Sequence, residues 1–261
     1  MEEAVASGLE GLAITDHDTL AGYDLAAPLA RAAGLDLVCG IEISTKFHAR
    51  SVHLLGYFVH EAPTGEFREW LLALKKSRRE RNLRMIERLR SFGLDVSIEE
   101  VEARGRSMAG RPHFARLLIE KGYVSTIEQA FRDYLDESAK GYVERMEATM
   151  AEGIERVAKA GGVASLAHPI RVNRRGRDGD AEFENGLSQM VGMGLRAMEV
   201  YHSDHRPEDV ARYQELARRF DLAVTGGSDF HGANKPGIEL GRGLRGNLNV
   251  PRSVLDDLRA L

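Results

Sequence analysis

The feature that most constrains how this 261-residue chain can fold is an alternation of short apolar runs with helical patterns. The apolar runs are GLAIT (11–15), LDLVCGIEI (35–43), VHLLGYF (52–58), GVASLA (162–167), LRAMEV (195–200) and LAVTGG (222–227). Helical periodicity lies between them, over residues 20–33, 154–160, 183–193 and 207–220. Strand and helix units repeated in this way predict a parallel sheet or barrel, and nearly continuous apolar runs are typical of strands buried on both faces.

The alternation stops between residues 66 and 146. This stretch shows helical patterns only, with a long one over residues 67–92 and shorter ones near Ile98, Pro112 and Thr126. We therefore expect a barrel domain formed by residues 1–65 and 147–261, with a helical insertion, or lid domain, at residues 66–146.

Composition argues against several classes of protein. A net charge of −4 gives no overall basic surface of the kind that coats nucleic acid or binds membranes. The single cysteine, Cys39, excludes an intramolecular disulfide and a zinc site built from cysteines, and its apolar surroundings favour a core position. We find no apolar run of about 18 residues and no signal-peptide pattern. These features predict a cytoplasmic protein without a membrane partner.

Histidines and carboxylates cluster where the apolar runs end. They are Asp16, His17 and Asp18 after the first run, His168 after the fourth, His202 and His205 after the fifth, and Asp229 and His231 after the sixth, with Glu42 inside the second run and His53 opening the third. In a βα barrel the carboxyl ends of the strands share one rim, where active sites form. Imidazole and carboxylate ligands without thiolate suit Zn, Mn or Fe, so the rim predicts a cluster of divalent metals.

Each of these residues also has a structural explanation when it is taken alone. A single histidine near a strand end is often a hydrogen-bonded structural residue, Asp18 or Thr19 could cap the following helix, and Glu42 could be half of a buried ion pair. The joint pattern favours metals, because so many buried polar groups without partners would be costly.

The segment AVTGGSDFHG (223–232) makes the metal hypothesis more specific. On an extended chain Asp229 and His231 point to the same side, about 6.6 Å apart, and can serve neighbouring metals. Gly226 and Gly227 would let the backbone pass close to the site.

Six motifs together resemble the PHP family, the polymerase and histidinol phosphatase domain family, from about Ala4 to Gly232. They are ITDHDT (14–19), GIEIS (40–44), HLLGY (53–57), AHP (167–169), EVYH (199–202) and GGSDFHG (226–232). The helical insertion and GRPH (110–113) are similar to the bacterial branch of 3′,5′-nucleoside bisphosphate phosphatases and 5′-to-3′ exoribonucleases. The resemblance implies an α/β fold, a distorted (β/α)7 TIM-like barrel, with up to three divalent metals. Mn is the first expectation, and Zn or Fe are the alternatives.

The resemblance also implies roles for individual residues. Glu42 would bridge two metals and be essential for catalysis, Asp229 would hold the first metal, His53 and His168 the second, and His17 and His231 the third. His202 and His205 would contact the phosphate or donate protons, and we assign His202 to catalysis and His205 to substrate binding. Arg111 and His113 would bind substrate from the lid, although His113 could instead cap a helix that begins near Pro112.

One family feature has no counterpart in this sequence. The family begins with a strand that carries a His-x-His pair, whereas Met1 here falls inside the expected first helix. We therefore expect a barrel without its first strand, with exposed backbone edges on the neighbouring strands and fewer metal ligands. A misassigned or removed start and a naturally degenerate form both explain this.

The expected function is that of a metal-dependent phosphoesterase, a hydrolase that removes the 3′-phosphate of 3′,5′-bisphosphonucleotides and trims short RNA in the 5′-to-3′ direction. Basic residues on the long helix, from Lys75 to Arg90, would guide a nucleotide or RNA, or would form a solvated face. The alternatives are a phosphatase of a small metabolite such as histidinol phosphate and a non-catalytic module that binds nucleic acid or a partner. No protein partner is implied for the enzyme.

Overall fold

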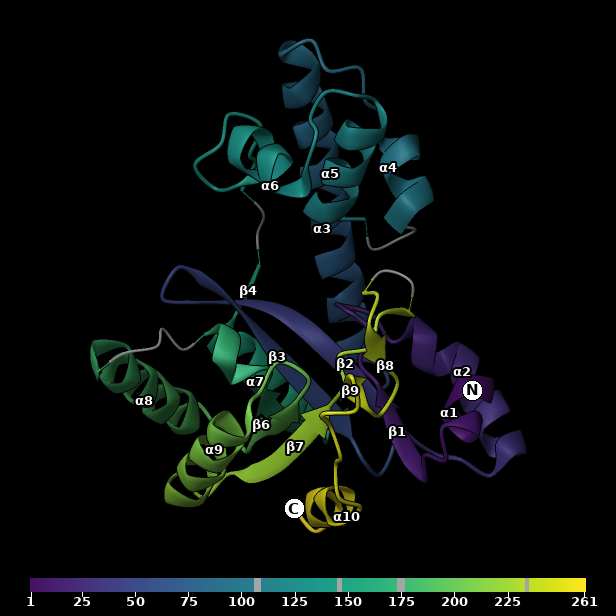
Figure 1. The fold of residues 1–261 in the computed structure, drawn as a ribbon, viewed down its shortest axis with the longest axis vertical. Helices are drawn as coiled ribbons and strands as arrows, with labels where there is room; N and C mark the ends of the chain where they lie inside the picture. Colours follow the sequence, from purple (N-terminus) through teal and green to yellow (C-terminus); the bar gives the residue numbers. More distant parts are fainter. Residues whose placement is uncertain (106–108, 145–146, 173–176, 233–234) are drawn as a thin grey trace. The chain divides into compact units, whose positions relative to one another are not determined.

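The computed structural model describes residues 1–105, 109–144, 147–172, 177–232 and 235–261. The chain divides into two compact units: Met1–Phe67 with Ala148–Leu261, and Arg68–Glu147. Figure 1 shows a curved sheet with surrounding helices in the first unit and a group of helices in the second. No helix among the described residues is both long and apolar enough to cross a lipid bilayer.

The first unit is built on one sheet with the strand order β1-β2-β3-β5-β6-β7, and β4 pairs with β2. The strands are β1 (Gly11–Ile14), β2 (Asp36–Phe47), β3 (Arg50–Phe58), β4 (Ala148–Thr149), β5 (Val163–Leu166), β6 (Ala197–His202) and β7 (Ala223–Gly227). All six apolar runs are therefore strands. Within the described residues β1 and β7 form the two ends of this order and do not pair with each other. The sheet is curved into a half-barrel, as Figure 1 shows.

Helices cover the outside of this sheet. They are α1 (Glu2–Ala6), α2 (Ala21–Ala33), α7 (Met150–Lys159), α8 (Arg177–Gly192), α9 (Pro207–Arg219) and α10 (Ser253–Arg259). Helix α2 packs on β2, α7 packs on β3 and β5, and α9 packs on β6 and β7. Helix α7 illustrates the cause, since Met150, Ile154 and Val157 form a buried stripe at helical spacing. The predicted α/β architecture is confirmed.

The prediction of a wholly parallel sheet is wrong at one strand. Strand β3 runs antiparallel to both β2 and β5. The reason is the connection, in which only His48 and Ala49 lie between β2 and β3 and both have positive φ, at 46° and 61°. Two residues with positive φ form a tight hairpin turn, whereas a parallel return needs a crossover of a dozen residues or more.

The interior of the half-barrel is apolar at one end and polar at the other. Val38, Leu55, Tyr57 and Ala167 form an apolar cluster that Leu258 of α10 joins. Asp36 at the start of β2 accepts hydrogen bonds from Arg259 of α10, so α10 lies at the amino end of β2. The opposite end receives the polar side chains described below.

The second unit has its own hydrophobic core. Its described elements include α3 (Glu66–Ser91, which begins in the first unit), α4 (Ile98–Gly105), α5 (Arg111–Glu120), α6 (Ile127–Ala130) and the π-helical turn Phe131–Leu135. Met85, Leu89, Val101, Phe114 and Leu117 are each buried within one cluster. A core of this kind is what allows a segment to be compact in its own right.

Candidate metal centre

A cavity of about 950 Å³ lies in the first unit, and its lining extends from Arg252 and Leu258 at the amino end of the sheet to His17 and His231 at the rim. Towards the rim its lining includes ionisable side chains from several strands or their ends, namely Asp16, His17, Glu42, His168, Glu199, Asp229 and His231. Most of these residues were predicted to meet at one rim. The structure brings them together although they are up to 215 positions apart, from Asp16 to His231 (231 − 16 = 215).

Glu42 is the centre of this group. Its Oε1 lies 2.6 Å from Nδ1 of His53 and 3.0 Å from Nε2 of His168, and its Oε2 lies 3.4 Å from Nε2 of His17. The residue is only 5% exposed. Burial alone would raise the pKa of the Glu42 carboxyl, but hydrogen bonds from His168 and His53 hold it well below its usual range. Glu42 is therefore an ionised carboxylate surrounded by three imidazoles.

Strand pairing explains why these side chains converge. After β1 the chain continues along β2, so His17 forms an isolated bridge with Glu42. His53 pairs with Ser44, which places it diagonally across from Glu42 on the same face. Because β3 is antiparallel, a residue near its start reaches the rim formed by the carboxyl ends of the other strands. His168 directly follows β5 and completes the group.

Three residues of the rim have a left-handed backbone although none is glycine. The φ angles are 52° at Asp18, 27° at His168 and 53° at Asp229. Such conformations cost about 1–3 kcal/mol each and persist where the surroundings hold them. At His168 the holding group is Glu199, whose Oε2 accepts the backbone N–H at 2.6 Å. At Asp18 the side chain accepts the backbone N–H of Ser44 at 2.8 Å, so Asp18 ties its loop to β2 and is not a helix cap.

The predicted extended geometry of Asp229 and His231 is wrong. Strand β7 ends at Gly227, and the left-handed backbone of Asp229 turns the chain there. The Nδ1 of His231 donates to the backbone carbonyl of Asp229 at 2.9 Å. Gly226 also permits close packing on β6, where an added Cβ would lie 2.7 Å from Cβ of Tyr201, and both Gly226 and Gly227 line the cavity.

The geometry groups the histidines differently from the family assignment. Ligand atoms of His17, Glu42 and His53 all lie within 4.8 Å of one another, which is a spacing that can hold a metal ion. His17 was expected to share a metal with His231, and the centroids of these two rings are 6.3 Å apart. The division of ligands among individual metals therefore stays a prediction.

His202 and His205 are both buried and differ in their surroundings. The Nδ1 of His202 accepts the N–H of Asp204, so its proton is on Nε2, 3.6 Å from Oδ2 of Asp229. His205 donates from Nδ1 to the carbonyl of Val200 at 2.7 Å, and burial lowers its pKa to about 4. His202 thus lies next to a predicted ligand, whereas His205 is a neutral side chain inside the first unit. Their roles in catalysis and substrate binding stay predictions.

Sequence reasoning placed Asp16 at the rim without an individual role, and it did not single out Arg171 or Lys235. Asp16 lines the cavity. Burial raises the pKa of its carboxyl, and a hydrogen bond from the backbone of Gly22 only partly offsets this rise. Arg171 and Lys235 contact Asp229 from loops with no recognisable motif.

The predicted substrate residues of the insertion are engaged within the second unit. Arg111 lies over the ring of Tyr142, 5.7 Å from its centroid. Nδ1 of His113 accepts the N–H of Gly110 at 3.1 Å, which is the helix-capping alternative. On α3, Arg81 is only 5% exposed, whereas Lys76, Arg79, Arg84, Arg88 and Arg90 are exposed, so both explanations of the basic helix stay open.

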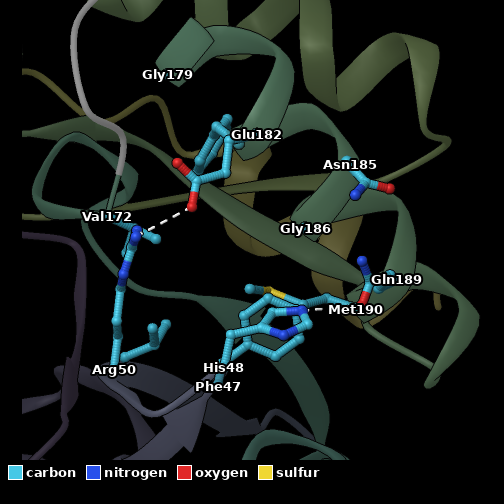
Figure 2. A pocket seen from close by; sticks show the side chains of 12 residues that line it. Phe47, His48, Arg50, Val172, Gly179, Glu182, Asn185, Gly186, Gln189 and Met190 are labelled. Carbon is cyan, nitrogen blue, oxygen red and sulfur yellow. Dashed lines mark hydrogen bonds and ion pairs between the residues drawn. The ribbon is translucent and has the colours of Figure 1, made fainter.

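A second cavity, of about 330 Å³, lies between the β2–β3 hairpin and α8 (Figure 2). Its polar groups already pair with each other. Arg50 lies 3.1 Å from Glu182, and Nε2 of His48 lies 3.0 Å from Oε1 of Gln189. Compared with the end of the sheet around Glu42, this cavity offers few groups for chemistry.

Three named bacterial enzymes are similar to this chain in sequence. A 5′-3′ exoribonuclease of Haemophilus influenzae is 31% identical over 98% of this chain and 89% of its own. A 3′,5′-nucleoside bisphosphate phosphatase of Chromobacterium violaceum is 28% identical over 92% of this chain and 84% of its own. A phosphoribosyl 1,2-cyclic phosphate 1,2-diphosphodiesterase of Eggerthella lenta is 33% identical over 89% and 87%.

A solved structure from Bifidobacterium adolescentis, provisionally named a metal-dependent phosphoesterase, covers 99% of this chain and 88% of its own. It is 34% identical and superposes with a TM-score of 0.80, in agreement with the distorted TIM-like fold. No family model matches the chain. Identities of 31% and 33% across most of both chains, together with the histidines and carboxylates gathered at the rim, show that the protein is a hydrolase of the PHP family.

Proposed function

We propose that this protein is a divalent-metal-dependent phosphoesterase that removes the 3′-phosphate of 3′,5′-bisphosphonucleotides and trims short RNA from its 5′ end. The observation that carries the proposal is the buried carboxylate of Glu42, contacted by His17, His53 and His168. Burying a carboxylate costs free energy, and a bound divalent cation would balance its charge among the three imidazoles.

The donor set fits divalent metals. Because the Glu42 carboxylate only accepts, the nitrogens of His53 and His168 that face it carry protons, and a metal would replace these protons on binding. His17, Glu42, His53 and His168 would hold metal at one part of the rim, with Asp229, His231 and Asp16 at the other. We propose Mn as the resident metal, with Zn or Fe as alternatives. Bound metals would polarise the phosphoryl group and activate water.

The surrounding residues orient the ligands. Since Nδ1 of His231 donates to the Asp229 carbonyl, the lone pair of His231 is on Nε2, the nitrogen left to bind a metal. Glu199 fixes the backbone of His168 through a 2.6 Å hydrogen bond. His202 directs Nε2–H towards Asp229, from where it would steady this carboxylate beside the substrate.

The choice of substrate rests on the relatives. Two of the named relatives act on RNA or nucleoside bisphosphates, and the third acts on a cyclic phosphate of ribose. All three substrates present a phosphoester on a ribose, and the cavity of about 950 Å³ can admit a group of this size. We also propose a cytoplasmic location, because two of the named relatives are enzymes of RNA or nucleoside bisphosphates.

The test is phosphate release from adenosine 3′,5′-bisphosphate with Mn²⁺, compared between the wild type, Glu42→Ala and Glu42→Gln. We expect release by the wild type and its loss in both variants, along with loss of bound Mn. His48→Ala is the matched control, because His48 is an exposed histidine of the β2–β3 turn that pairs with Gln189 and does not line the cavity around Glu42. Turnover that survives in Glu42→Ala would refute the metal centre. Preferential release from histidinol phosphate, or cleavage of a ribose cyclic phosphate alone, would reassign the substrate.

A further inference from the structure

The carboxylate of Asp229 is contacted by two permanent cations. Nη2 of Arg171 lies 2.9 Å from Oδ2 of Asp229, and Nζ of Lys235 lies 2.7 Å from the same oxygen. Arg171 is also fixed by Asp204, which accepts from its Nε at 3.0 Å and its Nη2 at 2.6 Å. The four charges balance, with two positive and two negative groups.

These groups come from three neighbouring strand ends. Arg171 ends the short helical turn Pro169–Arg171 after β5, Asp204 follows β6, and Asp229 and Lys235 follow β7. Strands β5, β6 and β7 are adjacent and parallel, so their carboxyl ends share one edge. The side chains of Arg171 and Lys235 are 40% and 29% exposed, which makes both accessible to a ligand from solvent.

Metal binding would disturb this balance. If Asp229 is a metal ligand, as the proposed function on which this inference rests requires, its negative charge faces a dication. Arg171 and Lys235 would then lie within a few ångströms of a like charge and lose much of their attraction to Asp229. They would need another anion in the same place.

We propose that Arg171 and Lys235 bind the phosphoryl group that undergoes hydrolysis. A guanidinium can donate two parallel hydrogen bonds to phosphate oxygens, and an ammonium adds a compact positive charge. Both groups contact Asp229, the proposed metal ligand, so they lie beside the place where negative charge would develop as the phosphoester breaks. Asp204 keeps the guanidinium in place when Asp229 turns to the metal. The two cations thus exchange a carboxylate of the protein for the phosphate of the substrate.

The first test needs no metal and no turnover. In the chelator-treated Asp229→Asn variant the two cations lose their carboxylate, so inorganic phosphate should bind about tenfold or more tightly than to the chelator-treated wild type. Adding Arg171→Gln or Lys235→Gln to Asp229→Asn should remove this gain. Arg206→Gln is the matched control, because Arg206 is an exposed arginine that follows β6, the strand between β5 and β7, and pairs with Glu208. Isothermal titration with phosphate gives the affinities.

The second test uses the metal-loaded protein, so that the inference does not depend on the folding of Asp229→Asn. Arg171→Gln and Lys235→Gln should each lower kcat/KM by about 10²-fold with unchanged Mn content. Unchanged kcat/KM in both variants, or equal phosphate affinity with and without the two cations, would overturn the inference while leaving the phosphoesterase intact. Phosphate binding that depends on both cations in a protein without turnover would overturn the proposed function and reduce the inference to a phosphate-binding site.

Discussion

Replacing Asp36 by asparagine should weaken the attachment of α10 to the amino end of the sheet. The Asp36 carboxylate accepts two hydrogen bonds from Arg259, at 2.7 and 2.8 Å, and one from Arg252 at 2.8 Å. The asparagine amide keeps the shape of the side chain but has no charge and only one acceptor oxygen. The two-pronged contact with Arg259 would be lost.

The size of the effect follows from geometry and exposure. The side chains of Asp36, Arg259 and Arg252 are 27%, 34% and 40% exposed, so solvent screens both pairs. Exposed pairs contribute about 0.2–1 kcal/mol each, with two-pronged arginine contacts at the upper end. We therefore expect Asp36→Asn to lower the free energy of unfolding by about 1–2 kcal/mol. In a chain of this size that corresponds to a fall in Tm of roughly 2–8 °C.

The effect of Asp36→Asn should depend on pH in a defined direction. Hydrogen bonds and the charge of Arg259 hold the pKa of the Asp36 carboxyl below its ordinary value of 3.8. A carboxylate whose pKa is lowered by folding adds stability that is complete above its unfolded pKa and is lost as pH falls through its folded pKa. The difference between wild type and variant should therefore be constant from pH 8 to pH 5 and shrink below about pH 4.

The assay is urea unfolding followed by circular dichroism at several pH values, for single variants at Asp36 and Arg259 and for the double variant. A coupling energy near zero, or a difference that grows as the solution becomes acidic, would refute the reasoning. Asp257→Asn on the same helix is the control, because Asp257 is exposed and should change stability little.

Three further predictions concern buried positions. Gly40→Ala should destabilise the first unit by about 1–3 kcal/mol in urea unfolding, because the new Cβ would lie 2.9 Å from the backbone oxygen of Ile14. Asn82→Ala should cost about 1–3 kcal/mol and speed hydrogen exchange in the insertion, since Nδ2 of Asn82 donates to a buried carbonyl at 2.8 Å. Burial raises the pKa of Glu199 to about 7, so the metal-free wild type should lose up to about 3 kcal/mol relative to Glu199→Gln as pH rises from 4 to 8. A stability difference that does not change with pH would contradict this last prediction.

Much of the fold and of the rim could be predicted from the sequence because burial and strand ends leave strong patterns. The six apolar runs match the strands, and Glu42, His53 and His168 meet as the motifs indicate. The direction of β3 was not predictable in the same way. Its turn uses His48 and Ala49 in a conformation that usually has glycine or asparagine, so the sequence carries no hairpin signal there.

Other features of the site depend on tertiary contacts. The left-handed backbone of Asp229 leaves no mark in the sequence, since aspartate is compatible with several conformations. Arg171 and Lys235 lie in loops, where charged residues are common, and only the folded chain shows that both contact one carboxylate.

If His168 and Asp229 bind metal as proposed, their left-handed backbones set the most stable version of this fold against the working one. At each position glycine would relax the backbone, and it would also remove the side chain on which the rim depends. A lineage selected for stability alone would therefore drift towards an inert barrel, and one selected for turnover retains strain of about 1–3 kcal/mol at each position. The stability of this protein is in that sense limited by its chemistry, and stabilising changes are best sought away from the rim.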